Sequence, residues 1–317
     1  MKAENSLNFA ENLLDSPDVV CFGMLAIGIL LVVDKWPPQN DASIFQENKD
    51  IVCYDAAMIA CMLRGWNVKN AMIGTAVGQD YRGQWIATQL KEIGVLGEVR
   101  LDPQLETVFS VVVSDPTGAR TVFWQPNRKV LATLDTADLS LLQGSRLLYV
   151  DWYDEDHIIR PMDEAIRLNI PVFLNLEHKH KEPEILTRYA GRAIICQAVT
   201  DFVQLGDEPP LEVAKKLLAV GVEIAVVTLA KEGCLVMRGK EIIRVWAPSI
   251  KAIDSFGAGA SFSAGFIYSY LQGCSLEEMA RFATAAASIK VSRPGFEPPE
   301  LAEINKLASE LKVMKHT

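Results

Sequence analysis

A turn of small residues that opens a helix is the segment of this 317-residue chain best suited to chemistry. It reads Asp254-Ser255-Phe256-Gly257-Ala258-Gly259-Ala260, and a helical apolar pattern continues over 259–272. The first amides of a helix lack partners within it, so they attract an anion by hydrogen bonding and through the helix dipole. Glycine at 257 and 259 lets the backbone approach such an anion closely. Taken alone, the turn has a second interpretation, a tight turn that packs one helix against its neighbours.

Other polar residues leave alternatives open. Asp254 begins the turn. Asp55 precedes a helical segment, where it either contacts a ligand or caps the helix. The run His178-Lys179-His180-Lys181-Glu182 is interpreted as a solvated loop, because residues two apart in a loop rarely bind a metal alone. We therefore predict no metal site built on this run.

The elements that must position these residues alternate between short β-branched runs and amphipathic helical stretches. Expected strands lie near 19–22, 68–73, 147–150, 171–174, 193–196 and 224–228. Expected helices include 81–93, 156–168, 210–220, 259–272 and 301–313, with a capping box at Ser275 and Glu278. This alternation predicts βαβ units, a parallel sheet and helices on both faces.

Two segments break the alternation and predict a small flap. Residues 28–35 are apolar on both faces of a strand. Residues 107–114 and 120–124 form an expected hairpin, with Asp115-Pro116-Thr117-Gly118 at its turn. We expect these strands to form an antiparallel flap whose apolar face covers a ligand cleft or another subunit. A plain extension of the main sheet is the alternative.

Charge and cysteine content restrict the function classes. The net charge is −9 and the isoelectric point is near 5.1, which argues against nucleic acid, since phosphate contacts need clustered Lys and Arg. The most apolar stretch, 24–33, is too short to span a membrane. Six cysteines form no CxxC pair, and residues 1–17 carry no export pattern. We expect a cytoplasmic protein with reduced cysteines.

The turn resembles the Asp-Thr-x-Gly-Ala-Gly-Asp-Ser-Phe signature of the PfkB/ribokinase family of sugar and nucleoside kinases. The resemblance extends over nearly the whole chain. Matching segments are Val77-Gly78-Gln79-Asp80-Tyr81-Arg82-Gly83, Gly118-Ala119-Arg120-Thr121, Val227-Thr228-Leu229-Ala230-Lys231-Glu232-Gly233 and Ser292-Arg293-Pro294-Gly295. It implies a ribokinase-like three-layer α/β/α sandwich over residues 18–317, with lid strands near 27–52 and 107–125, after an extension at 1–17.

The resemblance also implies a set of functional positions. ATP and Mg²⁺ would lie along the C-terminal half, and a sugar would lie between the lid and the sheet. Positions that match the nucleotide site are Thr228, Gly233, Asp254, Gly257, Ala258 and Gly259. Positions that match the sugar site are Gly28, Tyr54, Asp55 and Met58. Family members often form dimers through the lid, so we consider a homodimer here as well.

The chain departs from the family pattern at the positions of the catalytic base, the sugar, the metal and the nucleotide. The catalytic base would be the seventh signature residue, which is Ala260, and a methyl group accepts no proton. The sugar-binding Asp is Gly28, and the Gly-Gly-x-x-x-Asn motif aligns with 53–58, which places Tyr54 where glycine touches the ligand. The Asn-x-x-Glu motif becomes Gln197-Ala198-Val199-Thr200, without a carboxylate for Mg²⁺. A glycine at the nucleotide edge is Ala230.

These replacements favour a catalytically inactive or repurposed family member, a pseudokinase that binds a small ligand or a protein partner. The ligand would be a sugar, a nucleoside or a phosphorylated compound. The alternative is an ATP-dependent sugar or nucleoside kinase with a non-standard base. ATP and Mg²⁺ are therefore expected from the resemblance but disfavoured by the residues present, and no metal-binding residue is assigned.

Overall fold

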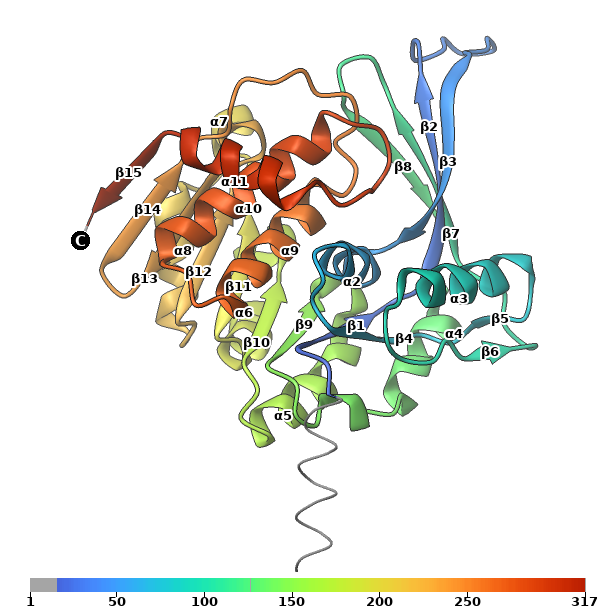
Figure 1. Ribbon diagram of the computed structural model, residues 1–317, viewed down its shortest axis with the longest axis horizontal. Coiled ribbons are helices and arrows are strands. Elements are labelled where there is room, and N and C mark those ends of the chain that lie inside the picture. Colours follow the sequence, from blue (N-terminus) through green and yellow to red (C-terminus); the bar gives the residue numbers. More distant parts are fainter. Residues whose placement is uncertain (1–15, 126, 317) are drawn as a thin grey trace, which may run out of the picture.

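The computed structural model describes residues 16–125 and 127–316. The first fifteen residues of the expected extension lie outside the described part. A nine-stranded sheet, a four-stranded lid and a two-stranded ribbon make up its sheets, and Figure 1 shows the lid strands projecting away from the main sheet. The ribbon pairs β5 (Val77–Gly78) with β6 (Leu101–Asp102).

The main sheet is mixed, and the prediction of a parallel sheet is correct only for its first six strands. The parallel strands are β1 (Val19–Gly23), β4 (Asn70–Gly74), β9 (Leu147–Asp151), β10 (Val172–Asn175), β11 (Ile195–Val199) and β12 (Ile224–Thr228). The antiparallel strands are β13 (Cys234–Arg238), β14 (Glu241–Val245) and β15 (Val313–His316). The order is β15-β14-β13-β12-β11-β10-β9-β1-β4. Strand β15 follows the last helix, where the sequence predicted helix up to residue 313.

Helices cover both faces of this sheet, as predicted. They are α2 (Asp55–Gly65), α3 (Tyr81–Ile93), α4 (Arg128–Leu131), α5 (Ile159–Arg167), α6 (Pro183–Tyr189), α7 (Phe202–Leu205), α8 (Pro210–Ala219), α9 (Ala258–Leu271), α10 (Leu276–Val291) and α11 (Leu301–Glu310). One apolar core lies under α2, α9 and α10, and a second lies under α5, α6 and α8. The fold is the predicted three-layer α/β/α sandwich (Figure 1).

Local signals fix the helix ends that position the site. The Asp80 carboxylate caps α3 by accepting from the Gly83 amide at 2.9 Å, and Gly94 ends the helix in the left-handed conformation. Ser275 and Glu278 form the predicted capping box of α10. The segment 259–272 is helical as expected, with α9 beginning one residue earlier.

The lid consists of β2 (Ala26–Val33), β3 (Phe45–Cys53), β7 (Phe109–Ser114) and β8 (Arg120–Trp124), in the order β3-β2-β7-β8. The two hairpins are antiparallel, but β2 and β7 pair in parallel, so the prediction of an antiparallel flap is wrong for the central pair. Each hairpin leaves and re-enters the main domain separately, and their first strands therefore meet side by side in the same direction.

The two faces of the lid differ in what they contact. Leu30, Ile51 and Val112 are buried and pack against Phe256 of the glycine turn. The opposite face carries Ile29 and Val111, which are half-buried. Phe123 continues that outer row and is 54% exposed.

The six cysteines carry free thiols, five of them buried. Among the helices of the described residues, none combines the length and apolar character needed to cross a bilayer.

Candidate functional site

The glycine turn occupies the start of α9, under the lid. Gly257 is the N-cap residue with φ 74°, in the left-handed region. A Cβ on Gly257 would lie 2.4 Å from the Cε of Met58 and 2.5 Å from Cδ2 of Phe296. A Cβ on Gly259 would meet nothing within 4 Å. The turn thus needs glycine at 257 for its conformation and packing, whereas Gly259 borders open space.

Backbone donors at this turn are available to a ligand. The amides of Gly257, Gly259 and Ala260 have no hydrogen-bond acceptor in the part of the chain that the structure describes. The next amide, that of Ser261, makes the first helical bond, to Gly257 O at 2.9 Å. Gly257 and Gly259 are at least partly exposed, so their two unpaired amides, at the positive end of a 14-residue helix, form a cradle for an anion.

The position of the catalytic base contains no proton acceptor. Ala260 is fully buried at the start of α9. Its neighbour Ser261 is also buried, and its hydroxyl has no partner among the described residues. The signature helix therefore supplies backbone amides to the site and no carboxylate.

Carboxylates gather instead at the carboxyl ends of the parallel strands. Asp151 of β9 and Asn175 of β10 are register partners, and both are buried. The Asn175 Nδ2 donates to Oδ2 of Asp55 at 3.3 Å and to Oε1 of Glu177 at 2.8 Å. Asp55 makes no capping bond to α2. The structure thus shows no capping role for Asp55, and its side-chain partner is Asn175.

Two further aspartates of this edge also have backbone partners. Asp154 is buried and accepts from the Met24 amide at 3.2 and 3.3 Å. Asp151 accepts from the Tyr153 amide at 3.0 Å. The phenol oxygen of Tyr149, two residues before Asp151, is buried without a partner among the described residues. We call Asp55, Asp151, Asp154 and Glu177 the carboxylate edge.

Burial and mutual repulsion raise the pKa of three aspartates of the carboxylate edge, Asp55, Asp151 and Asp154. Burial raises the pKa of Asp55 to about 7, the charge of Glu177 adds to this effect, and Arg120 opposes it. Burial raises the pKa of Asp154 to about 8. For Asp151, burial followed by the charges of Asp154 and Asp55 holds the pKa well above its ordinary value. These three aspartates therefore keep their protons to higher pH than ordinary aspartates, and in the protonated form they donate as well as accept hydrogen bonds.

Arg120 links the carboxylate edge to the glycine turn. It lies on β8 opposite Ser114, on the lid face that is directed at the main domain. Its guanidinium lowers the pKa of Asp55, and its Nη1 lies 3.3 Å from Ser255 O. Arg120 is thus the one exposed cation that the described contacts place over both parts of the site.

The sugar-site positions are only partly brought together. Met58 lies on the glycine turn, and Tyr54 and Asp55 begin α2 beside the strand edge. Gly28 lies within lid strand β2, where a Cβ would stand 2.9 Å from Ile51 Cγ1. Gly28 therefore packs inside the lid.

Tyr54 adopts φ 73° and ψ 146°, a backbone conformation that only glycine adopts easily. Ala230, at the expected nucleotide edge, also has a positive φ, 48°. At both positions the family pattern has glycine. At these two positions a glycine-like backbone conformation therefore carries a side chain.

The remaining nucleotide-edge positions form the turn between β12 and β13. Gly233 has φ 91°, and a Cβ there would lie 2.2 Å from Val245 O, so glycine is required. Thr228 is half-buried at the end of β12, and its hydroxyl lies 3.4 Å from Ala198 O. Ala230 and Gly233 thus give this turn two positive φ angles.

The residues at the predicted metal position do not fit Mg²⁺. Gln197 is buried, its Oε1 accepts from Ser263 Oγ at 2.9 Å, and its Nε2 has no partner within the described residues. Thr200 donates its hydroxyl to Glu208 O at 2.7 Å. Nowhere in ranges 16–125 and 127–316 do three His, Cys, Asp or Glu side chains form a group able to hold a metal ion. His180 of the 178–182 run is buried, so the prediction of a fully solvated loop is wrong at that residue.

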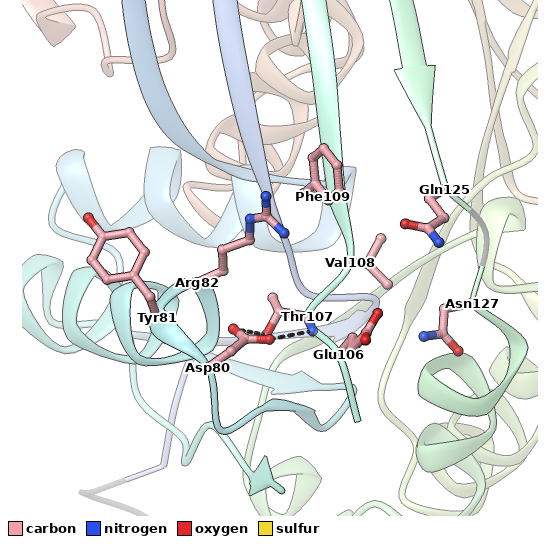
Figure 2. A pocket seen from close by; sticks show the side chains of 9 residues that line it. All are labelled: Asp80, Tyr81, Arg82, Glu106, Thr107, Val108, Phe109, Gln125 and Asn127. Carbon is pink, nitrogen blue, oxygen red and sulfur yellow. Dashed lines mark hydrogen bonds between the residues drawn. The ribbon is translucent and has the colours of Figure 1, made fainter. Parts of the chain in front are cut away.

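A cavity of about 520 Å³ lies at the base of the lid, and no local sequence pattern indicated it. Figure 2 shows Tyr81 and Arg82 at one side, with Gln125 and Asn127 at the other. The Arg82 guanidinium carbon stands 4.0 Å from the ring centre of Phe109. None of the predicted site residues lines this cavity, which is distinct from the carboxylate edge.

The sandwich, the lid and the glycine turn define a ribokinase-like protein. A family model described as pfkB family carbohydrate kinase matches residues 48–302, and the chain belongs to this family.

Relatives of known name are distant in sequence. The chain is 23% identical over 292 residues to a nucleoside kinase of Methanothermobacter thermautotrophicus, covering 88% of this chain and 90% of that protein. It is 24% identical over 240 residues to an uncharacterized sugar kinase of Archaeoglobus fulgidus, covering 72% and 93%.

Solved structures show the same fold. Ribokinase of Thermotoga maritima has a TM-score of 0.72 at 21% identity, covering 92% of this chain and 99% of that one. Ribokinase of Arabidopsis thaliana, in complex with ribose and ATP, has a TM-score of 0.70 at 20% identity, with the same coverage.

Proposed function

We propose that this chain is a catalytically silent PfkB-family protein that binds a small polyhydroxylated ligand between the lid and the main sheet. A ligand that also carries a phosphate would place it on the amides of the glycine turn. The observation that carries the proposal is the buried methyl group of Ala260 at the position of the base. A positioned base typically contributes about 10²–10⁴ in rate, and Ala260 contributes none of it.

The metal position supports the same proposal. Phosphoryl transfer depends on cations that neutralise the phosphates, and the segment Gln197-Ala198-Val199-Thr200 offers no carboxylate. Its Gln197 Oε1 accepts from α9, and its Thr200 hydroxyl donates to a neighbouring loop. The side chains of this segment thus serve packing.

The polar groups of the carboxylate edge and of the glycine turn indicate the class of ligand. Hydroxyl groups of a sugar or nucleoside pair well with the carboxylate edge, whose protonated members donate and whose ionised members accept. Arg120 and the unpaired amides of the turn suit a phosphate or another small anion. A sugar, a nucleoside or a phosphorylated derivative of either suits the carboxylate edge and the glycine turn together.

Two measurements on the same protein test this proposal. Thermal unfolding is followed with a panel of sugars, nucleosides and sugar phosphates, and ADP release is followed with Mg·ATP and each compound. A ligand at 100 times its dissociation constant adds about 2.7 kcal/mol of stability. We expect at least one compound to raise the midpoint and none to release ADP. Mg²⁺-dependent ADP release with a single acceptor would show that the protein is not catalytically silent. If no compound raises the unfolding midpoint, the proposed ligand binding is wrong.

The alternative function, a sugar or nucleoside kinase with a non-standard base, is favoured by one specific observation. Burial gives Asp55 a pKa of about 7, which suits a general base at neutral pH. If this alternative holds, Asp55→Asn abolishes ADP release and leaves the ligand-induced shift in place. If the protein is catalytically silent, neither wild type nor Asp55→Asn releases ADP.

We also propose a homodimer through the outer lid face, and a cytoplasmic location. The row Ile29, Val111 and Phe123 is apolar and incompletely covered within one chain, and a second copy would bury it. Free thiols at all six cysteines support the location, since oxidising compartments favour disulfides.

A further inference from the structure

Lys290 is one of the largest fully buried side chains of the protein, and its place under the glycine turn is unusual for a lysine. It lies in the last turn of α10, and its side chain is 1% exposed. Its Nζ donates to Oδ2 of Asp254 at 2.7 Å and to the main-chain oxygen of Asp254 at 2.8 Å. Asp254 is itself fully buried.

Such a pair needs an explanation other than stability. Removing two charges from water costs several kcal/mol per ion, and a buried pair often stabilises no better than apolar residues of similar size. Burial lowers the pKa of Lys290, while Asp254 acts in the opposite direction. The pair is therefore weak evidence of added stability, and what it visibly provides is a fixed geometry.

That geometry joins four segments at one carboxylate. Oδ1 of Asp254 accepts from Ser114 Oγ of lid strand β7 at 2.7 Å and from the Phe256 amide of the glycine turn at 3.0 Å. Oδ2 accepts from Lys290 and from the Gly295 amide at 3.2 Å. Both oxygens are thus saturated with donors, so the carboxylate has one orientation.

Further contacts show that the lid rests on the same turn. The Ser255 amide donates to Gly118 O of the lid hairpin at 3.1 Å. Lys49 of β3 pairs with Glu297 at 3.2 Å, beyond the glycine turn. Phe256 fills the space under Leu30, Ile51 and Val112. Asp254 is the buried polar centre of this contact.

We infer that Lys290 is a positioning residue whose ammonium group fixes Asp254, so that anion binding at the glycine turn and docking of the lid favour each other. The part of this inference that concerns anion binding rests on the proposed function, and the part that concerns docking of the lid does not. Coupling of two sites is reciprocal, so a perturbation of the lid must weaken the anion site and the converse.

Three variants test the inference by hydrogen exchange of lid strands β7 and β8 and by titration with inorganic phosphate. Lys290→Met keeps the bulk and removes the charge. We expect about tenfold faster lid exchange and about tenfold weaker phosphate binding, within the usual range of coupling. Ser114→Ala, which leaves Lys290 intact, should accelerate lid exchange and weaken phosphate binding in the same direction.

Chemical rescue distinguishes positioning from general damage. Lys290→Ala leaves a space lined by the Asp254 oxygens, which an added alkylammonium ion such as ethylammonium can enter. We expect ethylammonium chloride, compared with sodium chloride at equal ionic strength, to restore lid protection and phosphate affinity in Lys290→Ala and not in Lys290→Met.

The outcomes separate the inference from the function on which it partly rests. Lid exchange and phosphate affinity within twofold of wild type in Lys290→Met would overturn the inference. If wild-type protein binds no phosphate, the anion half of the proposed function fails. Lid exchange in the Met variant and its rescue in the Ala variant still decide the role of Lys290.

Discussion

The side-chain amide of Asn175 lies 3.3 Å from the carboxylate of Asp55, although 120 positions separate the two residues in the chain. This contact connects the start of α2 to the carboxyl end of β10, across the middle of the candidate site. It places Asp55 near Glu177. Burial and then the charge of Glu177 raise the pKa of Asp55, while Arg120 and the Asn175 amide oppose that rise.

The first prediction concerns pH. The folded state holds a proton on Asp55 up to about pH 7, whereas the unfolded chain releases it near pH 4. The contribution of Asp55 to stability must therefore fall as the pH rises between these values, since its folded state binds more protons there. Asp55→Asn should flatten this decline, by on the order of 1–3 kcal/mol at pH 8.

Thermal midpoints measured from pH 4.5 to pH 8.5, roughly spanning that window, check this expectation. Asp41→Asn, at an exposed position between β2 and β3, is the matched control and should follow wild type. Parallel curves for wild type and Asp55→Asn would contradict the assignment of a raised pKa.

The second prediction concerns the missing base. Ala260→Asp alone should not produce Mg²⁺-dependent ADP release, because no carboxylate stands at the predicted metal position. The variant should also unfold at a lower temperature, since position 260 is fully buried and a charge there is costly. ADP release in this single variant would show that the base is the only missing part. The double variant with Thr200→Glu tests whether both parts are needed.

A third prediction uses the backbone of Ala230. This exposed residue has φ 48°, which costs an alanine more than a glycine. Ala230→Gly should stabilise the protein by about 0.5–1 kcal/mol in urea unfolding, after the greater entropy of glycine in the unfolded chain is included. Ala87→Gly, within α3, is the opposite-sign control and should destabilise by about 1 kcal/mol.

A fourth prediction concerns Tyr54, which keeps a glycine-like backbone and half-buries a large ring beside Asp55. Tyr54→Gly should relieve roughly 1–3 kcal/mol of backbone strain and open the cleft to bulkier ligands. The thermal-shift panel should then respond to compounds that wild type ignores, while Tyr54→Phe behaves as wild type. An unchanged ligand profile in Tyr54→Gly would mean that the ring does not occupy ligand space.

The fifth prediction concerns assembly. Phe123 and Trp124 are adjacent and similarly exposed, at 54% and 60%, but they point to opposite faces of the lid. Phe123→Glu should convert a dimer to a monomer in light scattering, because it places a charge in the outer apolar row. Trp124→Glu should leave the dimer intact. A monomeric wild-type protein at micromolar concentration would contradict the lid dimer.

Much of the fold could be predicted from the sequence alone, because the signals for helices, strands and turns are local. The alternation of apolar runs with amphipathic stretches predicted the strands and helices, and helix α3 has the predicted bounds. Asp115 to Gly118 identified the lid hairpin, and Gly257 identified the turn that opens α9. Each of these depends on residues a few positions apart, so periodicity and turn chemistry suffice to detect them.

Relations between distant segments depended on the tertiary structure. No local pattern shows that β2 and β7 pair in parallel, or that β15 joins the sheet after the last helix. The positive φ of Tyr54 and Ala230 is a property inherited from the fold around them. Strand order decides which loops become neighbours, and that order is set by packing of the whole domain.

The candidate site likewise has features that the sequence predicts and features that only the tertiary structure decides. Residue types at single positions determined what the protein lacks, above all a carboxylate at Ala260. Only the folded chain decided what it has instead: a carboxylate edge assembled from Asp55, Asp151, Asp154 and Glu177, and a lysine at 290 buried against Asp254. Burial changes the proton affinity and the partners of a charged group, and burial is created by contacts that a linear sequence does not display.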